Sequence, residues 1–139
     1  MVARRAGALL TVIVLVLGLG GAAASAKKKH RKNGRAWASQ VTLTHPSSTR
    51  FAGVVSSKLG ACAGSRVVTL SYTDSNTGQT LPLSVQRTDG SGSYEMSLTK
   101  DAFAGTYQVR VDERKIRARK AKQTCGKAQS STIEVAAAS

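Results

Sequence analysis

Apolar and polar residues alternate with a period of two along much of the chain between residues 66 and 111. The apolar positions of each run share one parity: Val68, Leu70 and Tyr72; Leu83 and Val85; Tyr94, Met96 and Leu98; Tyr107, Val109 and Val111. Because successive side chains of a strand point to opposite faces of a sheet, these runs predict half-buried β-strands. Turn-forming Gly, Asp and Asn separate them, most densely in the central stretch 88–94.

The whole pattern predicts an all-β domain with short strands and no long helix. We expect strands at residues 41–44, 51–56, 66–72, 81–87, 94–98, 106–111 and 132–135. Seven strands at about ten-residue spacing indicate a β-sandwich.

Proline and glycine residues affect where individual predicted strands end, bend or lie in the sheet. We expect His45-Pro46 to end the first strand, and Gly53 to mark a bulge or a close backbone contact in the second. Pro82 argues against a central position for the strand 81–87, unless it is the first residue of that strand. In the charged segment 113–122 we expect a basic loop in preference to a helix.

The first 26 residues have the order of a secretory signal peptide. Arg4 and Arg5 precede an apolar run, and Ala24-Ser25-Ala26 forms an A-x-A cleavage site. An uncleaved transmembrane anchor is the alternative, but the apolar run has about 14 residues and a bilayer needs about 18–20. We therefore expect a protein that is secreted or associated with the cell envelope, with no transmembrane segment after cleavage.

Cleavage after Ala26 would leave residues 27–139, a length typical of one domain. We divide this part into a basic disordered segment (27–39), a β-sandwich domain (40–136) and a C-terminal tail (137–139). The whole chain has a net charge of +14, and loss of Arg4 and Arg5 leaves +12. Such a charge favours anionic polymers or surfaces as partners, but it does not specify a fold.

Cys62 and Cys125 are the two cysteines of the chain. In an oxidising compartment two cysteines most simply pair with each other, and two free thiols are the alternative. A disulfide that closes a loop of some sixty residues would remove about 4 kcal/mol of unfolded-state entropy. We expect it to join a position before the second core strand to the final strand, and so to clamp both ends of the fold.

Two basic segments form the candidate binding surface. Their cationic residues are Lys27, Lys28, Lys29, Arg31 and Lys32 in the first segment, and Arg114, Lys115, Arg117, Arg119, Lys120 and Lys122 in the second. Such clusters can bind anionic polymers with strong salt dependence, or they can be solvated and bind nothing. The second segment has no interleaved aromatic residues to stack bases, so we expect no nucleic-acid recognition there. Trp37 could anchor a partner or pack over the domain edge, and packing is favoured.

Several fragments resemble a known domain family. Residues 88–94 have the form T-D-x-x-G-x-Y, residues 104–111 resemble an A-G-x-Y-x-V-x-V strand, and residues 51–55 and 67–70 resemble two opening strands. Together they resemble the carboxypeptidase regulatory-like domain of exported bacterial proteins over about residues 50–136. The resemblance implies a seven-stranded antiparallel sandwich of Ig/transthyretin-like (prealbumin-like) type, an accessory or stalk role without catalytic residues, and a disulfide-bearing variant of that domain.

The sequence offers little for catalysis or metal binding. His30 falls in the basic segment and His45 precedes a proline, so we expect both to be solvated rather than to serve as bases. The carboxylates form no spaced acidic pair, and two histidines with two oxidised cysteines lack zinc-ligand spacing. The run Asp74-Ser75-Asn76 is too poor in acidic residues for a dedicated calcium site. We predict no enzyme activity, no metal and no cofactor.

The function predicted from the sequence is therefore an exported, non-catalytic module that binds an anionic cell-envelope polymer or surface through its basic segments. The alternative is a purely structural or accessory domain without a specific ligand. Salt-dependent binding of an anionic polymer would distinguish the first class from the second.

Overall fold

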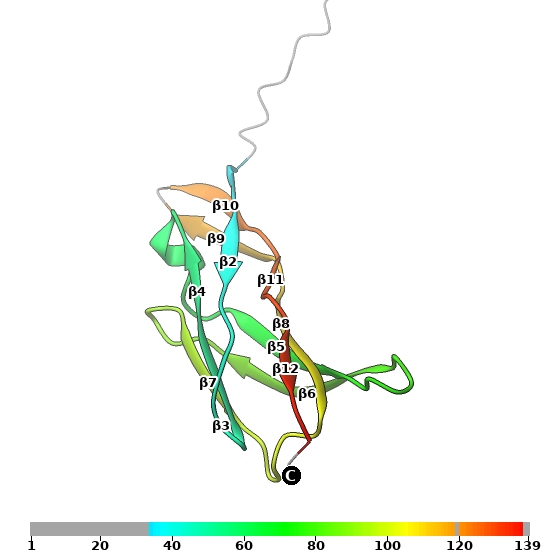
Figure 1. Ribbon diagram of the computed structural model, residues 1–139. Coiled ribbons are helices and arrows are strands. Elements are labelled where there is room, and N and C mark those ends of the chain that lie inside the picture. Colours follow the sequence, from blue (N-terminus) through cyan, green and yellow to red (C-terminus); the bar gives the residue numbers. More distant parts are fainter. Residues whose placement is uncertain (1–33, 119, 138–139) are drawn as a thin grey trace, which may run out of the picture.

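The computed structural model describes residues 34–118 and 120–137, which form an all-β domain (Figure 1). The predicted signal peptide, residues 27–33, Arg119 and the last two residues lie outside the described residues. The described elements are β1 (Ala36–Trp37), β2 (Ser39–Val41), β3 (Thr44–Ser47), β4 (Arg50–Ser57), η1 (Gly60–Cys62, a 3-10 turn), β5 (Val67–Thr73), β6 (Thr80–Arg87), β7 (Ser93–Ser97), β8 (Gly105–Val111), β9 (Arg114–Ala118), β10 (Ala121–Cys125), β11 (Ala128–Gln129) and β12 (Ile133–Val135).

Two sheets form the layers of a sandwich-like fold, and a third, smaller sheet lies at one end (Figure 1). One layer has the strand order β2-β4-β3 with β7 also on β4, and the other has the order β11-β8-β5-β6 with β12 also on β8. The third sheet has the order β1-β10-β9. Among the described strands, pairing is antiparallel except between β1 and β10, which run parallel. The predicted all-β, sandwich-like class is confirmed, whereas the sequence pattern does not predict the third sheet.

The main core lies between the two layers and follows the period-two pattern. Its buried side chains include Phe51, Val55, Tyr94 and Met96 from one layer and Val68, Leu70, Tyr107, Val109 and Val111 from the other. Alternate positions of each strand face inward, so the parity predicted for β5, β7 and β8 is confirmed.

The inward parity predicted for Leu83 and Val85 is wrong. Leu83 is 36% exposed and Val85 is 62% exposed. The register of β6 against β5 shifts just after Leu70, where β6 holds one residue more than its partner. An extra residue turns the side chains beyond it to the other face of the sheet. Ser84 therefore pairs with the inward-facing Leu70, and Val85 pairs with Thr69 and faces outward. β6 is also an edge strand of its sheet, as Pro82 predicted.

Three segments differ from the predicted elements. Residues 36–37 form a strand because their backbone pairs with β10, and residues 39–41 form another because theirs pairs with β4. The predicted disordered segment, 27–39, therefore ends in ordered structure. His45 and Pro46 lie within β3 instead of ending a strand, and the β3–β4 register is irregular there, which accommodates the missing proline N–H. Segment 113–122 is not a loop: most of it forms the hairpin of β9 and β10.

The glycine-rich stretch between β6 and β7 is a turn organised by Asp89. Its carboxylate Oδ1 accepts hydrogen bonds from the backbone amides of Ser91 (2.8 Å) and Ser93 (2.9 Å) and from the Ser91 hydroxyl (2.7 Å). These bonds, that of the Ser91 hydroxyl most strongly, hold the pKa of Asp89 below its ordinary value. Gly92 has a φ of +95°, which a residue with a Cβ rarely adopts.

The two core tyrosines place their rings inside and their hydroxyls on backbone carbonyls. Tyr94 Oη donates to the carbonyl of Thr42, and Tyr107 Oη donates to that of Phe103 at 2.9 Å. A Cβ on Gly53 would collide with the backbone carbonyl oxygen of Thr42 and with the Tyr94 side chain. The close backbone contact predicted for Gly53 is confirmed.

Candidate polyanion-binding site

The predicted disulfide is present and lies beneath the third sheet. Cys62 of η1 and Cys125 at the end of β10 are bonded, with Cα atoms 5.3 Å apart, and both are fully buried. With Leu59 they form a second buried cluster, separate from the main core, against which three partly buried side chains pack: Trp37, Ile116 and Ala118. The bond therefore ties η1 to the third sheet and not, as predicted, to the final strand.

A fully buried arginine joins this end of the molecule to the sandwich. Nη1 of Arg66 donates to the carbonyl of Cys62 (2.7 Å) and to Ser39 Oγ (2.9 Å). Nη2 donates to the carbonyls of Asp112 (2.6 Å) and Gly126 (2.7 Å). Burial lowers the pKa of Arg66, and the positive charge of a neighbouring arginine lowers it further. The four acceptors belong to four separate segments, so this one side chain fixes them relative to one another.

Three cations project from the outer face of the β9–β10 hairpin. Lys115, Arg117 and Lys122 are exposed, whereas the alternate residues Ile116 and Gln123 are half-buried and buried. Arg117 and Lys122 are direct cross-strand partners. Like charges that face each other across antiparallel strands repel, which makes this pair unfavourable for the fold.

Among the residues that the structure describes, no carboxylate forms an ion pair with these three cations. The ion pairs among those residues, Arg50–Glu95 and Arg110–Asp112, do not include the three hairpin cations. The sequence has no Asp or Glu within 34–41, 56–66 or 114–125, the segments that build this end. We call this end, formed by β1, β9, β10 and η1, the cationic end.

The other predicted basic residues have different roles or lie outside the described residues. Arg114 turns inward, and its Nη1 donates to the carbonyls of Gly64 (2.9 Å) and Ser65 (3.1 Å), so it braces the hairpin. Lys120 is exposed in the hairpin turn with a φ of 60°, a left-handed conformation that non-glycine residues seldom adopt. Arg119 and the basic residues between 27 and 32 are not among the described residues.

The chain enters the described domain beside the hairpin. β1 runs parallel to β10, and the backbone N–H of Thr124 donates to the carbonyl of Arg35 at 3.0 Å. The part of the first basic segment that the structure describes, from residue 34 onward, therefore lies at the cationic end.

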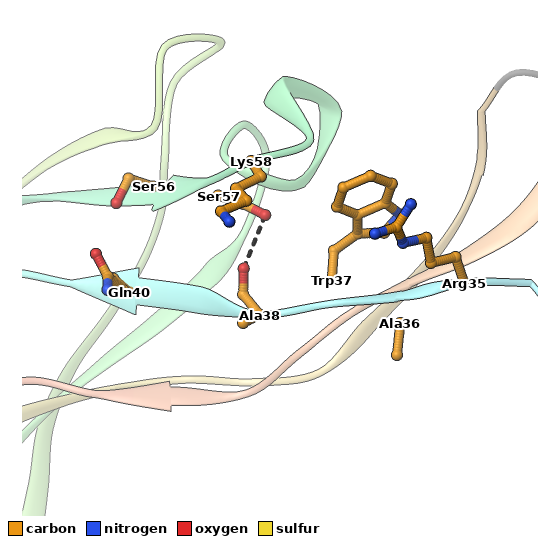
Figure 2. A pocket seen from close by; sticks show the side chains of 8 residues that line it. All are labelled: Arg35, Ala36, Trp37, Ala38, Gln40, Ser56, Ser57 and Lys58. Atoms are coloured by element: carbon orange, nitrogen blue, oxygen red, sulfur yellow. Dashed lines mark hydrogen bonds between the residues drawn. The ribbon is translucent and has the colours of Figure 1, made fainter.

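A pocket of about 500 Å³ opens beside β1 (Figure 2). Its lining residues are Arg35, Ala36, Trp37, Ala38, Gln40, Ser56, Ser57 and Lys58. The Arg35 guanidinium lies over the Trp37 ring, with its Cζ 4.4 Å from the ring centroid. Trp37 Nε1 donates to Gln123 Oε1 at 2.9 Å, so Trp37 packs at the domain edge, as the sequence favoured.

The sequence pattern does not predict this pocket. Arg35 and Lys58 are 23 positions apart, and they line one pocket because β2 pairs with the end of β4. One local signal is present in the sequence: Arg35 and Trp37 are two positions apart, so in a strand their side chains lie on the same face.

His45 is half-buried against the main core and not solvated as predicted. Its ring stacks on Phe51 with the ring centroids 4.4 Å apart, and among the described residues its Nε2 has no hydrogen-bond partner. Within residues 34–118 and 120–137, no three His, Cys, Asp or Glu side chains gather as a metal site would require. The same residues contain no helix with the length and hydropathy of a membrane span.

The chain has a distant structural likeness to a solved protein but no match in sequence. No protein-family profile matches the chain, and no curated protein matches it in sequence. Among solved structures, the chain is similar to a tetra-tandem repeat in the extending region of a large adhesion protein, with 18% identity and a TM-score of 0.38. The match covers 70% of this chain and 24% of that one, so this chain spans about a quarter of the length of that structure. A likeness at this level carries neither fold nor function to the present chain.

Proposed function

We propose that this protein is an exported, non-catalytic β-sandwich module that attaches to an anionic polymer through its cationic end. The observation that carries the proposal is the placement of Arg117 opposite Lys122, with Lys115 on the same exposed face. Two facing cations repel, and a bound polyanion removes that repulsion while its counterions are released. The buried disulfide supports export, because disulfides persist in oxidising compartments.

The spacing of these cations suits a chain of repeated anions. Alternate positions along β9 lie about 7 Å apart, and facing positions on β9 and β10 lie about 5 Å apart. Both spacings are shorter than the Debye length of about 8 Å at physiological salt, so the three charges act together on a bound polymer. Such a surface responds to charge density and not to the order of units along the polymer.

We also propose that the domain is a variant of the carboxypeptidase regulatory-like, transthyretin-like sandwich with seven principal strands. Support comes from the Asp89-centred turn and from the two tyrosines with buried rings and carbonyl-bound hydroxyls. In this proposal the third sheet and its disulfide are additions to one end. Superposition on solved domains of that family should give a TM-score above about 0.5 over residues 50–136, and a lower value would contradict this assignment.

The binding proposal is tested with a charge-matched pair of double variants. The full chain, expressed with its own leader and purified in oxidised form, is titrated with inorganic polyphosphate at low salt. Arg117→Gln/Lys122→Gln should weaken binding by about tenfold or more, since each lost charge contact contributes about 1 kcal/mol. Arg50→Gln/Lys100→Gln, which removes two exposed cations outside the cationic end, should leave affinity within about twofold.

The alternatives give different results in the same titration. Equal loss in both double variants would show that net charge alone drives binding and would contradict a defined site. Absence of binding by the wild-type protein at low salt would leave a structural or accessory module without a polyanionic ligand.

A further inference from the structure

We propose that the pocket beside β1 binds the oxyanion and hydroxyls of a charged sugar unit, so that the polymer held at the cationic end is an anionic polysaccharide. This inference rests on the proposed function, since it names the class of polymer that the same end of the molecule would hold. It starts from Arg35 and Lys58, two cations outside the set that the sequence predicted to bind polyanions, and from Trp37.

Arg35 is held in an orientation that suits an oxyanion. Its guanidinium lies on the Trp37 ring, and Trp37 is itself fixed by its hydrogen bond to Gln123 and by packing on the disulfide cluster. Stacking occupies the flat face of a guanidinium and leaves the N–H groups at its edge free to donate in the plane. Within the described part of the chain these N–H groups have no acceptor, and a carboxylate or sulfate can take two of them at once.

The remaining lining supplies a second cation and groups that pair with hydroxyls. Lys58 is exposed at the rim, and no carboxylate lines the pocket. The Ser57 hydroxyl donates to the carbonyl of Ala38 at 2.8 Å (Figure 2) and accepts from the backbone N–H of Leu59 at 3.4 Å, which leaves one lone pair to accept from a ligand hydroxyl. Ser56 and Gln40, cross-strand partners on β4 and β2, add a hydroxyl and an amide. Cations beside hydroxyl and amide groups match a sugar that carries an acid.

A nucleic acid fits this pocket less well. Bases bind single-strand sites by stacking on open aromatic faces. Trp37 is the one aromatic residue of the lining; Arg35 lies over its ring, and the side chain is partly buried against the disulfide cluster. A sugar acid needs only the edge of the guanidinium, the ammonium of Lys58 and the hydroxyls.

The test compares two probes of equal charge and uses the single tryptophan of the chain as a local reporter. Trigalacturonate carries three carboxylates on hydroxylated rings, and N-acetyl-triglutamate amide carries three carboxylates without hydroxyls. The full chain in oxidised form should bind trigalacturonate at least about tenfold more tightly and change its Trp37 emission on binding, because the ring hydroxyls of this probe add hydrogen bonds, and about two of them account for that factor. Arg35→Gln/Lys58→Gln should remove both the preference and the emission change.

The hairpin variant separates this inference from the proposed function. Arg117→Gln/Lys122→Gln should weaken both probes by the same factor and keep the preference for the sugar. Equal affinity of the wild-type protein for the two probes, with unchanged Trp37 emission, would overturn the pocket assignment while polyphosphate binding still supports the cationic end. A deoxyoligonucleotide that changes Trp37 emission as strongly as the sugar would also overturn it. Failure of all these probes, polyphosphate included, would overturn both proposals.

Discussion

At the scale of single residues, Arg66 carries a buried charge that is met by backbone dipoles. Its guanidinium donates to three carbonyls and one hydroxyl from separate segments, and its Nε has no acceptor within the part of the chain that the structure describes. Arg66→Met should lower the free energy of unfolding by about 3 kcal/mol or more, because buried acceptors would lose their donors. Urea denaturation measures the change. Arg66→Lys keeps the charge but has one donor nitrogen in place of the two that Arg66 uses, so it should destabilise the protein less than Arg66→Met. A loss below about 1 kcal/mol for the methionine variant would contradict this role.

Tyr94 should make stability depend on alkaline pH. Burial raises the pKa of Tyr94 to about 12 from its ordinary value of 10.0. A raised pKa means that the folded state disfavours the phenolate. The contribution of the protonated Tyr94 to folding stability is therefore complete below pH 10 and is lost as the pH rises toward 12. Tyr94→Phe should cost about 1 kcal/mol at neutral pH through the lost hydrogen bond to Thr42, yet lose less stability than wild type between pH 10 and 12. Denaturation at pH 7, 10 and 11.5 compares the two, and parallel pH profiles would count against this assignment.

At the scale of elements, the disulfide and its small cluster hold the third sheet. The bond closes a separation of 63 residues, and the cluster around it is distinct from the main core. Cys62→Ala/Cys125→Ala should therefore lower stability by about 4 kcal/mol. Backbone amides of β9 and β10 should exchange with solvent much faster, while those of β5 and β8 keep more of their protection. Hydrogen exchange resolved by strand makes the comparison, and a uniform increase across all strands would contradict a separable end.

The period-two pattern predicts strands well where one face is buried and the other is solvated. β5, β7 and β8 fit it, because inward positions such as Val68 and Val109 are apolar. It fails at β6, where one extra residue near Leu83 reverses the faces and the edge position leaves both of them near solvent. It also fails at β9 and β10, because most of their inward side chains other than Ile116 are small or polar. The many cations on the outer face make the alternation around Ile116 and Gln123 hard to recognise in the sequence.

At the scale of the whole molecule, the charge is concentrated at one end. Composition predicts a basic protein, and the two cysteines predict the disulfide, but neither places the charges in space. The structure divides the predicted cluster: Lys115, Arg117 and Lys122 face outward, whereas Arg114 braces the hairpin. The pocket around Arg35 and the buried Arg66 depend on contacts between distant segments, so no local pattern could reveal them.

The salt dependence of polyanion binding tests the central claim most directly. Polyphosphate affinity is measured between low and physiological salt for wild type, for Arg117→Gln/Lys122→Gln and for the charge-matched Arg50→Gln/Lys100→Gln. Each cation that contacts the polymer contributes slightly less than one unit to the slope of log affinity against log salt. The hairpin variant should therefore lose about 1.5 units of slope, and the control variant should keep the wild-type slope. Identical slopes for all three proteins would contradict a binding site at the cationic end.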